Sequence, residues 1–144
     1  MSSSKSAIYF FYESPVYLRQ RTVLKQFIQS IFTKEKKPLR CLNYIFCSDE
    51  RVLEINRQFL RHDYYTDIIT FELSLFKAPV EGEIYISIDR VKENAMEINV
   101  SFTQELHRVI FHGALHLCGY SDKTKLQKER MREKENFYLN QYFR

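Results

Sequence analysis

Two histidines and an aspartate late in the chain have the types and spacing of a metal site. His112 and His116 are four residues apart, and residues at that spacing share one face of a helix. Gly119 follows where such a helix is expected to end, and a glycine there commonly reverses the chain. The reversal would return Asp122, six residues beyond His116, toward both imidazoles. Two imidazoles and one carboxylate suit one Zn²⁺ ion, with a fourth position left for water.

The spacing His-x-x-x-His-x-x-Gly-x-x-Asp is shared with the extended motif of zinc proteases. Those proteases carry a general-base glutamate directly after the first histidine, whereas this chain has Gly113 there. Ordinary peptidase chemistry is therefore not expected. A glycine inside a helix costs about 0.5–1 kcal/mol relative to alanine, so we expect Gly113 to have a packing or site reason, such as the close approach of another backbone or of a bulky substrate.

Three polar or sulfur-containing side chains lie near this segment. Glu105 is seven residues before His112 on the same helical stripe, where it would either orient a ligand or face solvent. His107 falls off that stripe and is expected to be structural. Cys118 lies on a different helix face from His116, so we expect it to pack rather than to bind the metal.

The chain around this segment alternates apolar runs typical of strands with amphipathic runs typical of helices. Four strands are expected, at residues 6–12, 39–46, 67–71 and 83–88. Five helices are expected, from residue 14 to beyond residue 31 and over residues 48–60, 90–98, 101–118 and 124–142. The order β-α-β-α-β-β-α-α-α predicts an α+β domain.

Each expected helix start has a residue whose side chain can cap the backbone. These residues are Ser14, which Pro15 follows, and Ser48, Asp89, Ser101 and Thr124. The last two have a glutamine three residues on, Gln104 and Gln127, which is the spacing of a capping box. Pro79 and Gly82 are expected in the connection between the last two strands.

Composition excludes several classes of protein. With 144 residues, 44% of them hydrophobic, the chain can fold as one domain over residues 1–144 without disulfides. The odd cysteine count, Cys41, Cys47 and Cys118, indicates reduced packing residues. No apolar run approaches the roughly 18–20 residues of a membrane span. The run after the polar stretch Met1–Ser6 is too short for a signal peptide, so we expect a cytoplasmic protein.

Charge is unevenly distributed along the chain. The net charge is +4, but residues 17–40 sum to +6 and residues 123–134 to +4, so the remainder carries −6. Segregated positive charge attracts polyanions such as RNA. Basic helix faces are also common on soluble proteins, so the charge alone leaves both interpretations open.

Three segments resemble the motifs of one known family. Residues 112–122 resemble the signature H-G-x-L-H-L-x-G-Y-D-H of the YbeY endoribonucleases, bacterial factors in ribosomal RNA maturation. Residues 55–71 resemble the family's L-N-x-x-Y-R-x-x-D-x-P-T-D-V-L-S-F, and residues 82–87 resemble its G-D-I-x-I-S. The segments occur in the family's order, which makes a chance match improbable.

The resemblance implies a zincin-like α+β domain, with one mixed four-stranded sheet and about five helices. It implies one Zn²⁺ ion held by His112, His116 and Asp122. It also implies single-strand-specific cleavage in maturing the 3′ end of small-subunit ribosomal RNA and in ribosome quality control. We therefore expect a monomer whose partners are ribosomal RNA and the small ribosomal subunit, with no membrane contact.

Two positions depart from the family's pattern. Asp122 stands where the third ligand is usually histidine, and its negative charge is expected to make the metal a weaker Lewis acid. Leu60 stands where the family has an arginine thought important for activity, and Arg61 follows it, with Arg57 four residues before Arg61. Because a shift of one helical residue turns a side chain by about 100°, the sequence leaves open whether Arg61 substitutes.

Zinc-dependent RNA cleavage is the leading hypothesis from the sequence. The ion would activate a bound water and polarise a phosphoryl oxygen, or stabilise charge while the RNA 2′-hydroxyl attacks. The candidate bases are Asp67 and Glu105, and the candidate RNA contacts are Arg57, Arg61, Lys123 and Lys125. Tyr64 and Tyr65 would either stack single-stranded bases or pack in their loop.

Three other functions remain open at this point. A zinc peptidase shares the ligand spacing but lacks the glutamate. Another small-molecule metallohydrolase would have a closed pocket. A non-catalytic, zinc-containing ribosome-biogenesis factor would keep the basic surface and function without the metal. The Leu60 departure makes this last function the main alternative.

Overall fold

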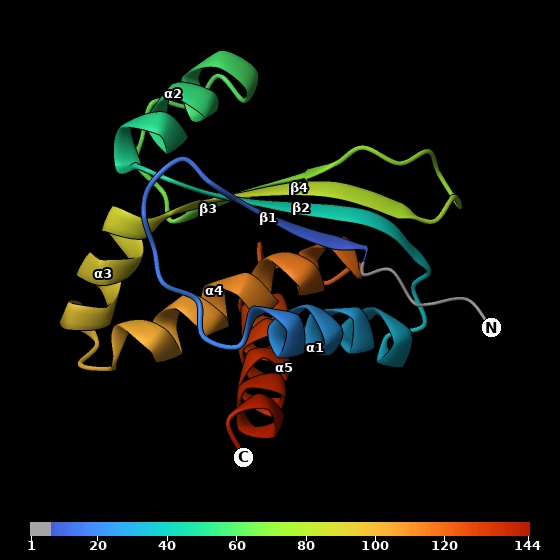
Figure 1. The fold of residues 1–144 in the computed structure, drawn as a ribbon. Helices are drawn as coiled ribbons and strands as arrows, with labels where there is room; N and C mark the ends of the chain where they lie inside the picture. The colour runs from blue at the N-terminus through green and yellow to red at the C-terminus, as the bar shows by residue number, and fades with distance from the viewer. Residues whose placement is uncertain (1–6) are drawn as a thin grey trace.

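The computed structural model describes residues 7–144 and contains one mixed four-stranded sheet (Figure 1). Its strands β1 (Ile8–Tyr12), β2 (Leu39–Cys47), β4 (Val80–Ser87) and β3 (Ile68–Glu72) lie side by side in that order. β1 pairs parallel with β2 and β2 parallel with β4, whereas β3 pairs antiparallel with β4. The helices are α1 (Arg21–Lys34), α2 (Asp49–Phe59), α3 (Ile88–Glu97), α4 (Phe102–Leu117) and α5 (Lys125–Tyr142). The expected α+β class, mixed sheet and element order are confirmed.

The sequence also leads to expectations about a signal peptide and about membrane-spanning segments. The stretch Met1–Ser6, which enters the signal-peptide interpretation, lies outside the described residues. Within the described part of the chain, no helix combines the length and the hydropathy needed to cross a membrane.

The main hydrophobic core lies between one face of the sheet and α4. In Figure 1, α4 runs beneath the sheet, α1 lies beside it and α5 crosses below it. Alternate residues of β2 point into this core, so Leu42, Tyr44 and Phe46 are fully buried. The Tyr44 hydroxyl donates to the carbonyl oxygen of Ile110 on α4 at 2.8 Å. Helix α4 is therefore fixed against the sheet along the length that carries the candidate ligands.

A smaller core on the opposite face of the sheet holds α2 in place. Val52 and Ile55 of α2 pack with Cys47 of β2 and Ile69 of β3. Ser48 begins α2 as expected, since its Oγ accepts from the backbone N–H of Arg51 at 3.1 Å. The segment that follows α2 then leads into β3, over the sheet edge that faces the end of α4.

Helix α1 begins six residues later than the sequence predicts, with Gln20 and not Ser14 at the capping position. Ser14 does not cap it, because the backbone N–H groups of Glu13 and Ser14 donate to the Phe46 carbonyl oxygen at 2.8 and 3.0 Å. The chain is thereby held at the sheet edge beyond β1. It buries Leu18 in the core and enters the helix only at Arg21.

The start of α3 also differs from the expectation. Ser87 is the capping residue, since its Oγ accepts from the backbone N–H of Arg90 at 3.0 Å. Asp89 lies inside the first turn, where its carboxylate accepts from the backbone N–H of Asp49 at 2.9 Å. Both Ser87 and Asp89 have side chains that can cap a helix. The Asp89 carboxylate binds the backbone at the start of α2 instead, and Ser87 is the cap.

Gly82 lies inside β4 and not in the connection before it, because the strand begins at Val80. A β-carbon on Gly82 would be 2.7 Å from Cδ1 of Leu117 and 3.2 Å from the carbonyl oxygen of Phe71. The glycine therefore allows the last turn of α4 to lie close to the sheet.

Ser101 and Thr124 cap the last two helices, as expected. Ser101 Oγ accepts from the backbone N–H of Gln104 at 3.0 Å, and α4 begins directly after it. Thr124 and Gln127 form a complete capping box at the start of α5. The loop between these helices contains the third candidate ligand.

Candidate metal centre

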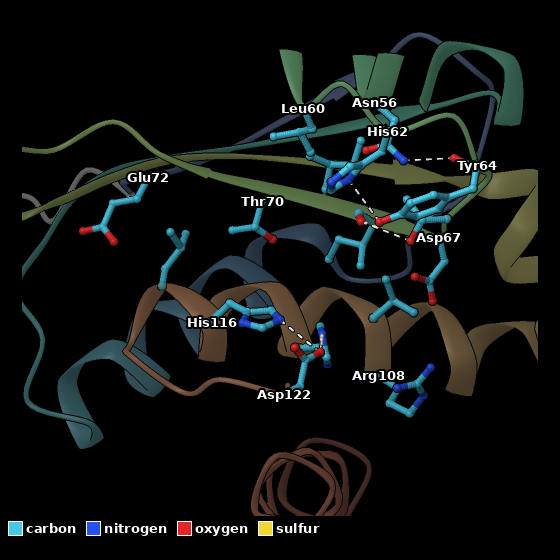
Figure 2. Close-up of a pocket in the computed structure, with 16 residues that line it drawn as sticks. Asn56, Leu60, His62, Tyr64, Asp67, Thr70, Glu72, Arg108, His116 and Asp122 are labelled. Carbon is cyan, nitrogen blue, oxygen red and sulfur yellow. Dashed lines mark hydrogen bonds and ion pairs between the residues drawn. The ribbon is translucent and has the colours of Figure 1, made fainter. Parts of the chain in front are cut away.

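The three predicted ligands lie together at the end of α4 and in the loop that follows it (Figure 2). Nε2 of His112 and Nε2 of His116 are 3.4 and 3.3 Å from Oδ2 of Asp122. When two ligand atoms bind the same tetrahedral zinc ion at about 2.0–2.1 Å each, the tetrahedral angle places them about 3.3–3.4 Å from each other. The two distances to Asp122 and the chemistry of the three donors therefore fit one zinc ion, and all three donor atoms lie within 4.8 Å of one another.

The second nitrogen of each imidazole already has a hydrogen-bond partner. His116 Nδ1 lies 2.9 Å from the carbonyl oxygen of Tyr120, which can only accept, so Nδ1 carries the proton. His112 Nδ1 lies 2.5 Å from Oε2 of Glu135 and donates to it as a carboxylate. Both Nε2 atoms are thus left with lone pairs directed toward Asp122, as metal-binding histidines require.

The turn after α4 has the form predicted from Gly119. Its φ is 105°, and its N–H donates to the carbonyl oxygen of His116 at 3.0 Å. The N–H of Tyr120 donates to the carbonyl oxygen of Leu115 at 3.1 Å, which completes the hydrogen-bond pair of a Schellman motif. This reversal places both the Tyr120 carbonyl and Asp122 beside the imidazoles.

Two residues behind the candidate ligands, the buried Glu135 and the half-buried Arg108, were not predicted from the sequence. The Arg108 guanidinium donates from Nη1 to Glu135 Oε1 at 3.0 Å and from Nε to Glu105 Oε1 at 2.8 Å. Burial acts to raise the pKa of Glu135, but the hydrogen bond from His112 and the charge of Arg108 outweigh it and lower that pKa. Glu135 therefore remains an acceptor for the imidazole.

Of the two places considered for Glu105, the solvent-facing one is wrong, and Glu105 also does not contact a candidate ligand directly. Its side chain is buried, and its carboxylate binds the Arg108 guanidinium through both oxygens. The direct contact with the ligand His112 comes from Glu135 of α5 instead. Glu105 thus reaches the ligands through Arg108.

The ligands line one wall of a cleft of about 660 Å³. In Figure 2, α4 forms this wall, and β3 with the segment after α2 forms the facing wall. The facing wall includes Leu60, His62, Tyr64 and Asp67. The His62 and Tyr64 rings are stacked, with centroids 5.2 Å apart and the Tyr64 hydroxyl 3.0 Å from His62 Nδ1. His62 was not predicted from the sequence as a residue of the site.

Asp67, the other candidate base, does line the cleft. Burial raises its pKa, although the charges of Arg108 and His112 oppose that change. Asn94 on α3 donates to Asp67 Oδ2 at 3.4 Å. A carboxyl group with a raised pKa in a cleft has the properties of a proton donor or acceptor.

The predicted RNA contacts fall into two places. Lys123 and Lys125 are exposed at the start of α5, directly after the ligand loop. Arg57 is exposed and pairs with Asp63 at 2.5 Å. Among the described residues, the cleft lining includes Leu60 but neither Arg57 nor Arg61. Leu60 therefore faces the cleft itself.

Gly113 is buried against the sheet, on the side of α4 away from solvent. A β-carbon there would be 2.8 Å from Cδ1 of Ile84 and 3.0 Å from Cδ1 of Ile68. The packing reason expected for this glycine is confirmed, and the nearest atoms are side chains of β4 and β3 rather than another backbone or a substrate.

The remaining histidine and cysteine interpretations on α4 are confirmed. His107 is buried, its Nδ1 lies 2.6 Å from the carbonyl oxygen of Thr103, and its ring stacks on Tyr142. Cys118 is buried, and burial raises the pKa of its thiol to about 12. Cys41 and Cys47 are also free thiols.

Comparison with known proteins gives one consistent result. The sequence model of the endoribonuclease YbeY family matches residues 13–143. Endoribonuclease YbeY of Cytophaga hutchinsonii is 53% identical over 137 residues, which cover 94% of this chain and 96% of that protein. The same protein of Flavobacterium psychrophilum is 46% identical over 129 residues, covering 90% and 91%. The solution structure of TM1509 from Thermotoga maritima superposes with a TM-score of 0.65 at 33% identity, covering 92% of this chain and 86% of that one. The chain therefore belongs to the YbeY endoribonuclease family.

Proposed function

We propose that this protein is a zinc-dependent endoribonuclease that cleaves single-stranded RNA. The observation that carries the proposal is the convergence of His112 Nε2, His116 Nε2 and Asp122 Oδ2 on one wall of the cleft. The two relatives that are 53% and 46% identical to this chain are named endoribonucleases. Donor chemistry and family membership together support RNA as the substrate.

Zinc bound by His112, His116 and Asp122 supplies a Lewis acid that activates water and polarises a phosphoryl oxygen. The residues of the chain prepare that chemistry. Glu135 and the Tyr120 carbonyl hold the two imidazoles in the orientation that keeps Nε2 available. Asp67, with its raised pKa, faces the same cleft and is our candidate for proton transfer.

Two features of the surface suit a single RNA strand. The stacked rings of His62 and Tyr64 line the facing wall, where an unpaired base can stack on them. Lys123 and Lys125 are exposed beside the ligand loop and can contact phosphates. A base that is paired in a duplex offers no free face for such stacking, so this wall favours single-stranded RNA.

We further propose the biological setting that the family resemblance implies. The protein would act as one monomeric domain over residues 1–144 in the cytoplasm, on ribosomal RNA and the small ribosomal subunit. Its reaction would mature the 3′ end of the small-subunit RNA and serve ribosome quality control.

A non-catalytic, zinc-containing ribosome-biogenesis factor is the second candidate function. One observation favours it: Leu60 lines the cleft at the position of the family's arginine. A zinc peptidase has less support, since Gly113 is buried against Ile84 and Ile68, where a protease's catalytic glutamate has no route to a substrate.

The proposal is tested by comparing the wild type with His116→Ala and Asp122→Asn for bound zinc, RNA cleavage and small-subunit association. Glu97→Gln is the control, because Glu97 is an exposed carboxylate at the end of α3, outside the metal centre and the cleft. We expect both ligand variants to lose zinc and cleavage while the control keeps them. Full RNA cleavage by zinc-free His116→Ala would contradict the metallonuclease. A wild type that binds zinc and the subunit but cuts no RNA would support the non-catalytic factor.

A further inference from the structure

A buried carboxylate from the last helix contacts one of the candidate metal ligands. Glu135 lies on α5, 23 residues after His112, and its Oε2 is 2.5 Å from His112 Nδ1. The whole residue is only 2% exposed, and its neighbours on the same face of α5 are the buried apolar residues Met131, Tyr138 and Leu139. A charged residue in such a position requires a partner.

Arg108 and Glu105 complete a buried network behind Glu135. Arg108 binds Oε1 of Glu135 at 3.0 Å, which leaves Oε2 for His112. The same guanidinium binds both oxygens of Glu105, a residue 1% exposed. Each carboxylate oxygen of Glu135 thus has a separate partner, and the carboxylate cannot rotate without breaking one of these hydrogen bonds.

The charges of this network favour a cation on the far side of His112. Glu105 and Glu135 carry two negative charges, which face the positive charges of Arg108 and of Arg132, whose Nη1 is 3.8 Å from Glu135 Oε1. Asp122 adds a third negative charge next to His112 Nε2, and its described ion pairs are with His112 and His116 alone. A divalent ion bound at Nε2 would compensate that charge, so the network and the metal ion stabilise each other.

From this geometry we infer that Glu135 is a positioning residue of the metal centre. Held by Arg108 and Glu105, it fixes the His112 ring with the proton on Nδ1 and makes Nε2 a stronger ligand. This inference rests on the proposed zinc site and extends it to α5. It predicts that zinc affinity depends on a residue that does not touch the metal, as carboxylates behind metal-binding histidines commonly show.

The test is the zinc dissociation constant of Glu135→Gln, measured by competition with a chelator of known affinity. Glutamine keeps the size of the side chain and an oxygen acceptor but removes the charge. We expect zinc to bind about 10–100-fold more weakly than to the wild type. Glu133→Gln is the matched control, because Glu133 is an exposed glutamate on the same helix, and its zinc affinity should stay within about twofold of the wild type. Circular dichroism in excess chelator establishes that each variant is folded.

A second measurement uses the wild type alone and does not depend on the variant's folding. Long-range ¹H–¹⁵N spectra of the zinc-loaded protein report which nitrogen of His112 binds the metal and which keeps its proton. We expect zinc on Nε2 and the proton on Nδ1. Zinc on Nδ1 would overturn the inference, because that nitrogen could then not donate to Glu135.

The outcomes separate this inference from the function on which it rests. If the wild type binds zinc and Glu135→Gln binds it equally tightly, the positioning role is wrong while the metal centre stands. If the wild type binds no zinc, both the metal centre and the role of Glu135 are wrong.

Discussion

Gly113 of α4 lies directly against Ile84 of β4, so that a β-carbon at position 113 would be 2.8 Å from Cδ1 of Ile84. This close approach explains why a glycine stands at position 113, and the sequence alone does not reveal the contact with Ile84. It also separates the helix from those of zinc proteases, in which the residue after the first histidine serves as the base. In this protein that residue faces the sheet, and the ligand His112 before it faces the cleft.

Replacing Gly113 with glutamate should therefore destabilise the fold and create no peptidase. A carboxylate buried against Ile84 and Ile68 has no partner there, and such a charge costs roughly 3–5 kcal/mol. Gly113→Ala is the control. Its methyl group requires the end of the Ile84 side chain to move, but alanine regains about 1 kcal/mol of helix propensity. Urea denaturation in the presence of chelator measures both variants. A Gly113→Glu protein as stable as the wild type would show that the space is larger than the structure indicates.

The glycine that ends α4 should matter for zinc binding, whereas Gly82 should matter for the fold. Gly119 has a φ of 105°, a conformation that costs a residue with a side chain about 1–3 kcal/mol. Gly119→Val should shift the turn that brings Asp122 to the histidines and so weaken zinc binding. Gly82→Ala places a methyl group against Leu117 and should lower the free energy of unfolding with little change in zinc affinity. Calorimetric zinc titration of both folded variants tests this difference, and equal zinc affinities would count against the role of the turn.

Glu35 should stabilise the protein in a pH-dependent way. Its carboxylate accepts hydrogen bonds from the hydroxyls of Tyr138 and Tyr120, at 2.5 and 2.7 Å, and from Lys134 Nζ at 3.2 Å. Burial acts to raise the pKa of Glu35, but these hydrogen bonds outweigh it and hold the pKa below its ordinary value of 4.5. The unfolded chain therefore takes up the proton first, so the stabilisation is complete above pH 4.5 and is lost as the pH falls through the lowered pKa.

The corresponding measurement is the free energy of unfolding of Glu35→Gln against the wild type. Near neutral pH we expect the variant to be less stable by about 1–3 kcal/mol, because it cannot form hydrogen bonds to a charged carboxylate. In acid, well below the ordinary pKa, the two proteins should become nearly equal. Glu129→Gln, at an exposed position of α5, provides the control. A stability difference that is the same at every pH would contradict the assigned ionisation.

The lysines at the start of α5 should contribute to RNA binding by neutralising phosphates. Removing one lysine–phosphate interaction should reduce the slope of log affinity against log salt by about 0.7 for a single strand. We expect this reduction for Lys123→Gln and for Lys125→Gln, measured with a short single-stranded RNA in excess chelator. Lys77→Gln removes the same charge from the connection between β3 and β4 and should leave the slope unchanged. An equal reduction in all three variants would indicate that only net charge matters.

Local sequence patterns predicted that the candidate ligands His112, His116 and Asp122 lie together, because they are close along the chain. His112 and His116 are one helical turn apart, and Gly119 marks the reversal that returns Asp122. Glu135 was missed because it reaches His112 from another helix, and no spacing rule connects them. A signal did exist, since a glutamate interrupts the apolar side of α5.

The errors in the fold have a similar cause. Ser14 and Pro15 have the local form of a helix start, but the hydrogen bonds from Glu13 and Ser14 to Phe46 hold the chain at the sheet edge. Gly82 has the local form of a turn residue, yet it is required inside β4 by the approach of Leu117. In both cases an interaction between distant segments overrides a local preference.

Zinc held by His112, His116 and Asp122 is proposed to drive RNA cleavage, and restoring the metal to the zinc-free protein tests this most directly. The wild type is first freed of zinc with a chelator, and zinc is then returned in measured amounts while cleavage of a single-stranded RNA is followed. We predict no cleavage without zinc and a rate that rises in proportion to bound zinc until one ion is held per chain. A zinc-free protein that cuts RNA at the full rate would contradict the claim, as would restored cleavage in His116→Ala prepared in the same way.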